Sequence, residues 1–161
     1  MKEAARMRVV QAELADLAEI LALQYEAYQS EAKLLGNPNI PPLKETLADT
    51  RAAFQSSVLL KAVDESGAII GSVRARREGD SALVGKLMVR PALQGRGIGT
   101  QLLQAIEAHC PARRYELFTS SKSLRNLRLY ERLGYARFRE ARVSADLTLV
   151  YLEKKKSAAG Q

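Results

Sequence analysis

The chain has 161 residues, of which 47% are hydrophobic and 27% charged, with a formal net charge of +7. This composition is typical of a globular protein, and the length excludes two ordinary domains, so we expect one domain over 1–153 and a flexible tail over 154–161. No apolar run approaches the roughly 18 residues of a membrane span and no secretion signal opens the chain, which favours a cytoplasmic protein without a membrane partner.

Strand and helix signals alternate in the N-terminal half. Residues 7–12 predict a strand, and Asp16 followed by Glu19 is the pattern of a capping box that opens a helix ending before Gly36. A proline-rich loop, 37–42, comes next. A second helix is indicated by apolar residues at helical spacing: Leu43, Leu47, Thr50 and Phe54.

The C-terminal half begins with an extended pattern. Three strands joined by tight turns are expected to form an antiparallel meander: 58–63, 68–75 and 82–89. A helix, a strand, a helix and two final strands follow: 95–109, 115–119, 123–133, 136–141 and 146–152. We expect Ser123 to cap the helix that it opens. The order predicts a mixed α/β (α+β) fold, with a mostly antiparallel sheet of about six or seven strands flanked by about four helices.

The segment between the third strand of the meander and the next helix is the strongest chemical signal. Glycines at 95, 97 and 99 carry no Cβ and tolerate positive φ, so the backbone N–H groups of this loop can converge in front of the helix. The helix N-terminus adds unpaired N–H groups and about half a positive charge. Phosphate or pyrophosphate is the ligand that such a cradle favours.

Two well-known phosphate loops fit this segment badly. A Walker A loop requires Lys and a hydroxyl residue after its last glycine, but Thr100 and Gln101 follow Gly99. A dinucleotide fingerprint requires G-x-G-x-x-G and an acidic residue at the end of the next strand, whereas Glu116 lies near its beginning. ATP chemistry and hydride transfer are therefore not supported.

The loop resembles the acyl-CoA pyrophosphate loop of the GNAT superfamily of N-acetyltransferases. The matching residues are Val89-Arg90-Pro91 and Gln94 to Gly99, and a second block, 123–135, resembles the family's helix ending in Leu-Tyr-x-x-x-Gly-Tyr. The resemblance implies the GNAT-like fold and transfer of an acetyl group from acetyl-CoA to an amine by direct attack in a ternary complex. A dimer is common in the family, and the resemblance implies no metal.

The resemblance also implies which residues contact acetyl-CoA. The backbone of the strand and loop would hold the pantetheine and pyrophosphate: Leu87, Met88, Val89, Gln94, Gly95, Arg96, Gly97, Ile98, Gly99 and Thr100. Asn126 would bind the CoA arm, although Ser123 stands at the spacing that many relatives use, so either residue can take this role. Tyr130 matches the tyrosine proposed as the general acid near the sulfur.

The acceptor side carries no specific motif. Many relatives have a glutamate on the strand before the cradle, but Ser81–Val89 contains no carboxylate, so the general base is open. Glu31 and Glu45 flank the proline-rich loop, where a carboxylate could bind a cationic amine or draw its proton through water, but a plain surface glutamate is the simpler interpretation of each. Glu31 and Tyr28 are the candidate substrate residues. The acceptor is a small-molecule amine or a protein amino group.

Other functions stay as alternatives. The missing strand carboxylate leaves room for a non-catalytic acyl-CoA sensor or partner subunit. Binding to nucleic acid is weaker, since no nucleic-acid motif accompanies the charge. Covalent catalysis is disfavoured, because the neighbours His109 and Cys110 point about 100° apart at a helix end marked by Pro111. One histidine and one cysteine also disfavour a zinc site.

Overall fold

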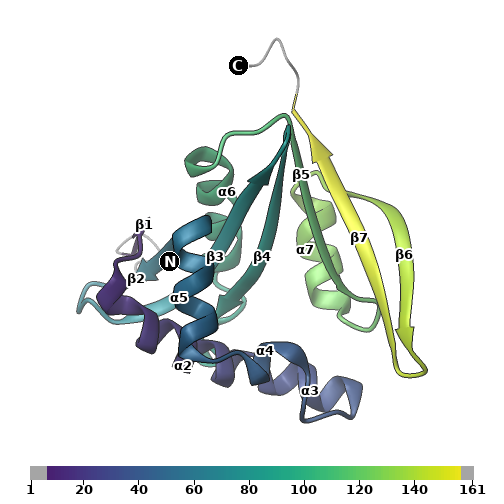
Figure 1. Ribbon diagram of the computed structural model, residues 1–161, viewed down its shortest axis with the longest axis horizontal. Helices are drawn as coiled ribbons and strands as arrows, with labels where there is room; N and C mark the ends of the chain where they lie inside the picture. The colour runs from purple at the N-terminus through teal and green to yellow at the C-terminus, as the bar shows by residue number, and fades with distance from the viewer. Residues whose placement is uncertain (1–6, 157–161) are drawn as a thin grey trace.

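A seven-stranded sheet forms the centre of the computed structural model, which describes residues 7–156 (Figure 1). The sheet order is β1-β2-β3-β4-β5-β7-β6, and only the β4–β5 pair is parallel. The bounds are β1 Arg8–Gln11, β2 Val58–Val63, β3 Ile69–Glu78, β4 Ser81–Val89, β5 Arg114–Ser120, β6 Ala136–Ser144 and β7 Leu147–Lys155. The predicted mixed, mostly antiparallel sheet is confirmed.

Helices cover both faces of this sheet (Figure 1). Their bounds are α2 Leu17–Ala27, α3 Gln29–Leu35, α4 Pro41–Lys44, α5 Leu47–Ser56, α6 Ile98–His109 and α7 Leu124–Arg132, with 3-10 turns at Leu14–Asp16 and Pro91–Leu93. One apolar cluster joins α6 and α7 to the sheet, and a second joins α2 to the other face. Among the described residues, no helix is both long and apolar enough to span a membrane.

Close packing of α6 on β3 depends on Gly71. A Cβ at this position would lie 2.9 Å from Leu102 Cδ1 and 3.0 Å from Met88 O. Since real Cβ atoms do not approach other atoms so closely, only glycine allows α6 to lie this near to the sheet. Gly71 of β3 therefore fixes the position of α6 and of the loop that precedes it.

The N-terminal helices are more broken than the apolar spacing predicts. The first helix divides at Tyr28, whose backbone leaves the helical region between α2 and α3. The capping box is formed by Glu13 and Asp16 rather than by Asp16 and Glu19, and it opens a 3-10 turn. The second helix divides at Glu45, because Thr46 and Asp49 form a capping box of their own. Both predictions of one continuous helix were wrong.

The two parallel strands separate soon after they meet. Their ladder runs only from the Ser81–Arg114 pair to the Leu83–Glu116 pair, and beyond it β4 and β5 diverge (Figure 1). A bulge in β4 accompanies the separation, since the pairing with β3 shifts register next to Lys86, whose φ is +52°. Bulges bend a strand and redirect a side chain, so Lys86 marks where β4 turns away.

The C-terminal strand continues into the segment predicted as a tail. β7 ends at Lys155, and Lys154 pairs with Tyr115 across the sheet. The Glu107 carboxylate binds Lys154 Nζ at 3.1 Å and Lys156 Nζ at 2.9 Å. The expected boundary at 154 was therefore wrong, because a buried carboxylate on α6 pairs with these lysines. Residues 157–161, the rest of that expected tail, lie outside the described residues.

Candidate functional site

The glycine loop forms a turn directly before α6. β4 ends at Val89, a 3-10 turn follows, and Gly95 and Gly97 then adopt φ of +82° and +85°. The first intrahelical bond of this region runs from Gln101 N–H to Gly97 O at 3.1 Å. The N–H groups of 98–100 thus have no acceptor inside the helix, and they point toward the loop. This backbone geometry agrees with the expected cradle, whose binding of an anion stays a prediction, and α6 begins at Ile98 rather than at residue 95.

Side chains hold the loop against α7. Arg125 Nη1 donates a hydrogen bond to Gln94 Oε1, and Gln94 Nε2 lies 3.5 Å from Val89 O. A Cβ at Gly99 would lie 3.5 Å from Leu129 Cδ2, so α6 and α7 meet closely here. Gln94 thus fastens the loop to both β4 and α7.

The other residues predicted to form the cradle differ in their exposure to solvent. Ile98 is buried in the core, while Arg96 is exposed and Thr100 half-buried. Only the backbone of Ile98 is available to a ligand at the cradle, whereas the side chains of Arg96 and Thr100 reach the surface of the loop.

Strands β4 and β5 diverge along the part of β4 that precedes the cradle. Met88 is buried and pairs with Ser72 of β3, whereas Leu87 and Val89 are half-buried. The edge of β4 that faces β5 lies beyond the end of their ladder. Asn126 of α7 contacts β5, with its Nδ2 at 3.3 Å from Thr119 Oγ1. We call the region where β4 and β5 diverge, beyond the Leu83–Glu116 pair, the slot; the edge of β4 and the Asn126 amide lie beside it.

Tyr130 lies on the same helix as Asn126. Its side chain is buried, and its ring centroid lies 6.2 Å from that of Tyr135. Burial, followed by the charge of Glu31, raises the pKa of the Tyr130 phenol above its ordinary value. The phenol is therefore a protonated hydrogen-bond donor at neutral pH.

The predicted substrate residues lie near α7. Ser123 Oγ donates a hydrogen bond of 2.9 Å to Glu31 Oε1, and the Ser123 side chain does not cap α7. The expected cap was wrong because Ser123 uses its hydroxyl to bind α3 instead. Tyr28 is half-buried, and burial followed by the nearby Tyr130 raises the pKa of its phenol. Glu31, Tyr28 and Tyr130 are thus brought together.

Glu45 is an interior carboxylate, not the surface residue that was expected. Arg74 Nη2 and Nη1 bind its two oxygens at 3.0 and 3.1 Å. Thr50 Oγ1 donates at 2.7 Å and Gln24 Nε2 at 3.2 Å. Burial opposes ionisation, but the bonds from Arg74 and Thr50 outweigh it and lower the pKa of Glu45 to about 2. Sequence reasoning missed Arg74, although a basic residue within the apolar strand 68–75 was a signal.

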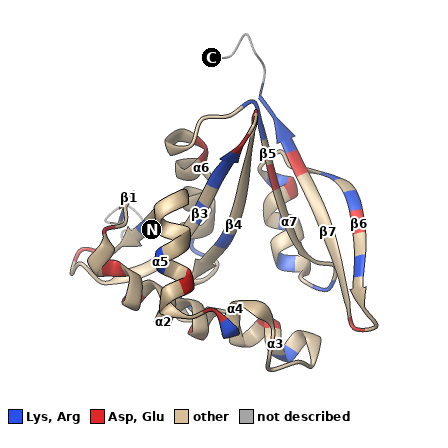
Figure 2. Cartoon of the chain, in the orientation of Figure 1, with Lys and Arg blue, Asp and Glu red and all other residues tan. Residues whose placement is uncertain are grey.

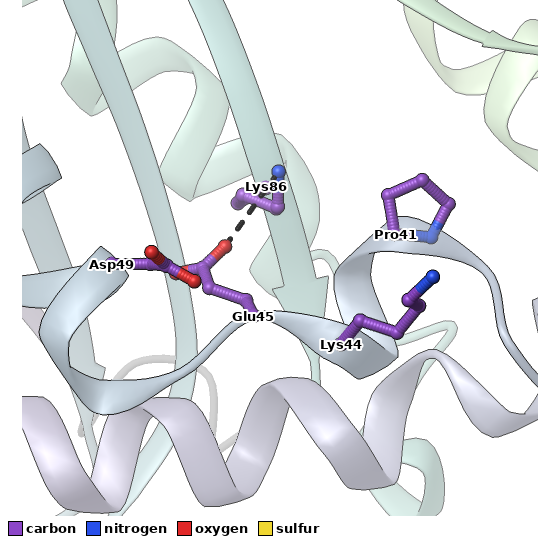
Figure 3. A pocket seen from close by; sticks show the side chains of 5 residues that line it. All are labelled: Pro41, Lys44, Glu45, Asp49 and Lys86. Carbon is purple, nitrogen blue, oxygen red and sulfur yellow. Dashed lines mark ion pairs between the residues drawn. The ribbon is translucent and has the colours of Figure 1, made fainter.

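Lys86 was also missed by the sequence analysis. Its side chain projects from the β4 bulge into a hollow of about 400 Å³, which is lined by Pro41, Lys44, Glu45, Asp49 and Lys86 (Figure 3). Burial and the Arg74 charge lower the pKa of the Lys86 amine, with Glu45 acting in the opposite direction. No sequence signal identifies this residue, because a bulge that turns one lysine inward leaves no local pattern.

Among residues 7–156, neither an activated thiol nor a metal-binding cluster occurs. The Cys110 thiol is buried, and burial raises its pKa, so it is not an activated thiolate. His109 Nδ1 lies 3.0 Å from Ala105 O at the end of α6. Within residues 7–156, no three His, Cys, Asp or Glu side chains gather in a way that could hold a metal ion.

Comparison with known proteins gives related folds and one curated relative. The UPF0157 protein YqkA of Bacillus subtilis is 27% identical over 132 residues, which are 81% of this chain and 38% of that protein. The chain thus spans well under half the length of that relative.

Solved structures share the fold at low identity. The ribosomal-protein-S18-alanine N-acetyltransferase of Escherichia coli superposes with a TM-score of 0.77 at 16% identity, covering 96% of this chain and 97% of that one. A phosphinothricin acetyltransferase of Sinorhizobium meliloti, in complex with acetyl-CoA, gives 0.74 at 19% identity, with 93% and 88% covered.

The sequence also matches a protein family over most of its length. Residues 15–135 match the acetyltransferase (GNAT) family, and this range runs from the 3-10 turn before α2 to the residue after Gly134. The match includes both the glycine cradle and α7, the two elements on either side of the slot. The chain therefore belongs to the acetyltransferase (GNAT) family.

Proposed function

We propose that the protein is an N-acetyltransferase that transfers the acetyl group of acetyl-CoA to a primary amine by direct attack within a ternary complex. The observation that carries the proposal is that β4, unpaired with β5 beyond Leu83, runs into the glycine turn before α6, and that its residues Leu87 and Val89 pack against the apolar cluster that contains Tyr130. A cradle alone is compatible with any phosphate ligand. A cradle joined to an open strand edge and a buried phenol suits a long thioester with a pyrophosphate.

The residues present fit acetyl-CoA. Positive φ at Gly95 and Gly97 and the free N–H groups of 98–100 suit a pyrophosphate. Leu87 to Val89 offer backbone groups to the pantetheine along the slot. Asn126 is the better candidate for the CoA arm, because the hydroxyl of Ser123 is already bound to Glu31.

Tyr130 is proposed as the general acid. Acetyl-CoA supplies an activated acetyl group as a thioester. As the acceptor nitrogen forms its bond to the acetyl carbon, the carbon–sulfur bond breaks and negative charge collects on the sulfur. The Tyr130 phenol, protonated at neutral pH, donates its proton to that sulfur. The buried phenol therefore suits the role of general acid, because it keeps its proton until negative charge collects on the sulfur.

Glu45 does not act as the base. With its pKa lowered to about 2 and both oxygens engaged by Arg74, it has little tendency to take a proton at neutral pH. We propose that the acceptor amine enters past Tyr28 and Glu31 and loses its proton to water. The carboxylate of Glu31, accepting from Ser123, orients that water or the amine.

The proposal also covers the class of acceptor and the oligomeric state. The two solved relatives are named for a protein alanine and for phosphinothricin, which are a protein amino group and a small molecule. Both classes carry an amine, so they support amine acetylation without choosing between them. We further propose a cytoplasmic homodimer in which each chain folds as one domain.

Calorimetric titration with acetyl-CoA, with ATP and NAD as competitors, combined with thiol release against a panel of amines, tests the proposal. Gly97→Glu should abolish acetyl-CoA binding, because the carboxylate enters the cradle. Gly67→Glu is the matched control, since Gly67 also has positive φ, at +89°, but lies in the β2–β3 turn. Binding without turnover on any amine would favour a sensor, and no binding would refute the cradle.

A further inference from the structure

The hollow beside the β4 bulge presents cations whose carboxylate neighbours are already engaged. Resting on the N-acetyltransferase function proposed above, we propose that the acceptor carries a carboxylate beside its amine, as a small amino acid does, and that Lys86 and Lys44 bind this carboxylate. Nothing in the family match specifies this group. It follows from the charges around the hollow, which Figure 2 shows as basic residues on β3, β4 and α4.

Glu45 is the carboxylate nearest to Lys86, and it is already neutralised. Arg74 binds both of its oxygens, and Thr50 and Gln24 add two more hydrogen bonds. Lys86 Nζ forms a long ion pair with Glu45 Oε1 at 4.0 Å, which is beyond hydrogen-bond distance (Figure 3). The Lys86 ammonium, which lines the hollow, therefore retains hydrogen-bond donors that Glu45 does not use.

Asp49 is the other carboxylate of the hollow, and its Oδ2 accepts a 2.9 Å hydrogen bond from Thr46 N–H. This bond belongs to the capping box of α5, so Asp49 is held at the helix N-terminus. Lys44 ends α4 and is exposed. No ion pair of Lys44 occurs among residues 7–156. Lys44 thus has no carboxylate partner among these residues, and Lys86 has only its 4.0 Å ion pair with Glu45.

The backbone of Lys86 supports a binding role. A lysine rarely adopts a φ of +52°, and such strain persists where the surrounding structure requires it. Here it directs a half-buried lysine, 28% exposed, to the acceptor side of β4. The lowered pKa of its amine agrees with an ammonium that lacks a full partner.

The short distance along β4 from Lys86 to the residues proposed for the pantetheine favours a small acceptor. Lys86 directly precedes Leu87, the first of the residues proposed to hold the pantetheine. An extended strand advances roughly 3.3 Å per residue, so Lys86 and Val89 lie roughly 10 Å apart along β4. A small amino acid spans the distance between a lysine side chain and a thioester at this edge. A polyamine, by contrast, would bring positive charge against Lys86 and Arg74.

The test is a comparison of matched acceptors at saturating acetyl-CoA. Each of the twenty amino acids is assayed beside its carboxamide, with spermidine and an N-terminal peptide as further acceptors, and CoA release is measured. We expect at least one amino acid to exceed its carboxamide by about tenfold or more in kcat/KM, since a site built for a polar group rejects the analogue lacking it. Equal rates for each pair, or a preference for spermidine or the peptide, would overturn the inference.

Variants separate binding of the carboxylate from damage to the fold. Lys86→Met should raise KM for the preferred amino acid by about tenfold, with the KM for acetyl-CoA and activity on the carboxamide unchanged. Lys86→Arg should restore most of the preference. Lys155→Met removes an exposed lysine at the far end of β7 and should change nothing. If Lys86→Met weakened the amino acid and its amide equally, the inference would be wrong.

Failure of the inference is distinguishable from failure of the proposed function. Acetylation of amines with no preference for a carboxylate would leave the N-acetyltransferase intact and remove only the acceptor class. Acetyl-CoA binding without release of CoA on any acceptor would overturn both.

Discussion

Ser123 Oγ and Glu31 Oε1 are 2.9 Å apart, and this hydrogen bond joins residues that are 92 positions apart in the chain. It connects α3, on the acceptor side, to the start of α7, which carries Asn126 and Tyr130. The N-terminal helices are therefore attached to the start of α7, the helix that carries the proposed general acid. In the proposed function, placement of an acceptor against Tyr130 depends on this contact.

Asn126 and Ser123 should differ in what their loss affects. Asn126→Ala should raise the Kd of acetyl-CoA about fivefold, the effect of one hydrogen bond of about 1 kcal/mol. Ser123→Ala should leave that Kd unchanged, raise the acceptor KM and lower the free energy of unfolding by about 1 kcal/mol. Calorimetry and denaturant titration distinguish the two. The assignment is reversed if Ser123→Ala is the variant that weakens acetyl-CoA.

Tyr130→Phe should lower kcat by about 10²-fold, while the KM of acetyl-CoA stays constant, because a general acid acts only as the sulfur leaves. Since burial raises the pKa of this phenol above its ordinary value, the acid stays protonated, and kcat should show no alkaline loss from Tyr130 up to about pH 10. Steady-state kinetics across pH provide the measurement. Tyr151→Phe, on β7, is the matched control. An unchanged kcat in Tyr130→Phe would exclude the role.

Glu45 should make stability depend on pH. Its pKa is about 2 in the folded protein against an ordinary 4.5. A carboxyl with a lowered folded pKa contributes stability above its unfolded pKa and loses it as pH falls, here between about 4.5 and 2. The full contribution is about 3 kcal/mol, and its measurement is urea unfolding at pH 7 and at pH 3. Glu45→Gln should flatten this dependence.

The sequence predicts the glycine turn before α6 well because the determinants of this turn are local. A strand, a proline, glycines 95 and 97 and a helix follow one another, and each residue acts on its own neighbours. The two signature blocks also lie together without any long-range assumption, since one parallel β-α-β unit and the following helix bring them side by side.

The acceptor side was predicted poorly because its contacts are distant in sequence. Glu45 and Arg74 are 29 residues apart, and only folding reveals that a loop carboxylate is buried by a strand arginine. The bulge at Lys86 has no residue signature. The same reasoning accounts for the tail: Lys154 becomes ordered through Glu107, 47 residues away.

Gly71 should be the glycine of the sheet that tolerates least change. Gly71→Ala would place a Cβ 2.9 Å from Leu102 Cδ1 and 3.0 Å from Met88 O, so α6 or β4 must move. We expect a loss of about 1–3 kcal/mol in the free energy of unfolding, measured by denaturant titration. Because Met88 and the start of α6 are among the residues proposed to bind acetyl-CoA, the Kd of acetyl-CoA should rise in the same variant. Gly85→Ala is the control: nothing lies within 4 Å of its Cβ, and stability should stay equal or rise slightly. Equal stabilities of the two variants would show that α6 adjusts freely, and its position over β3 would then not be fixed by Gly71.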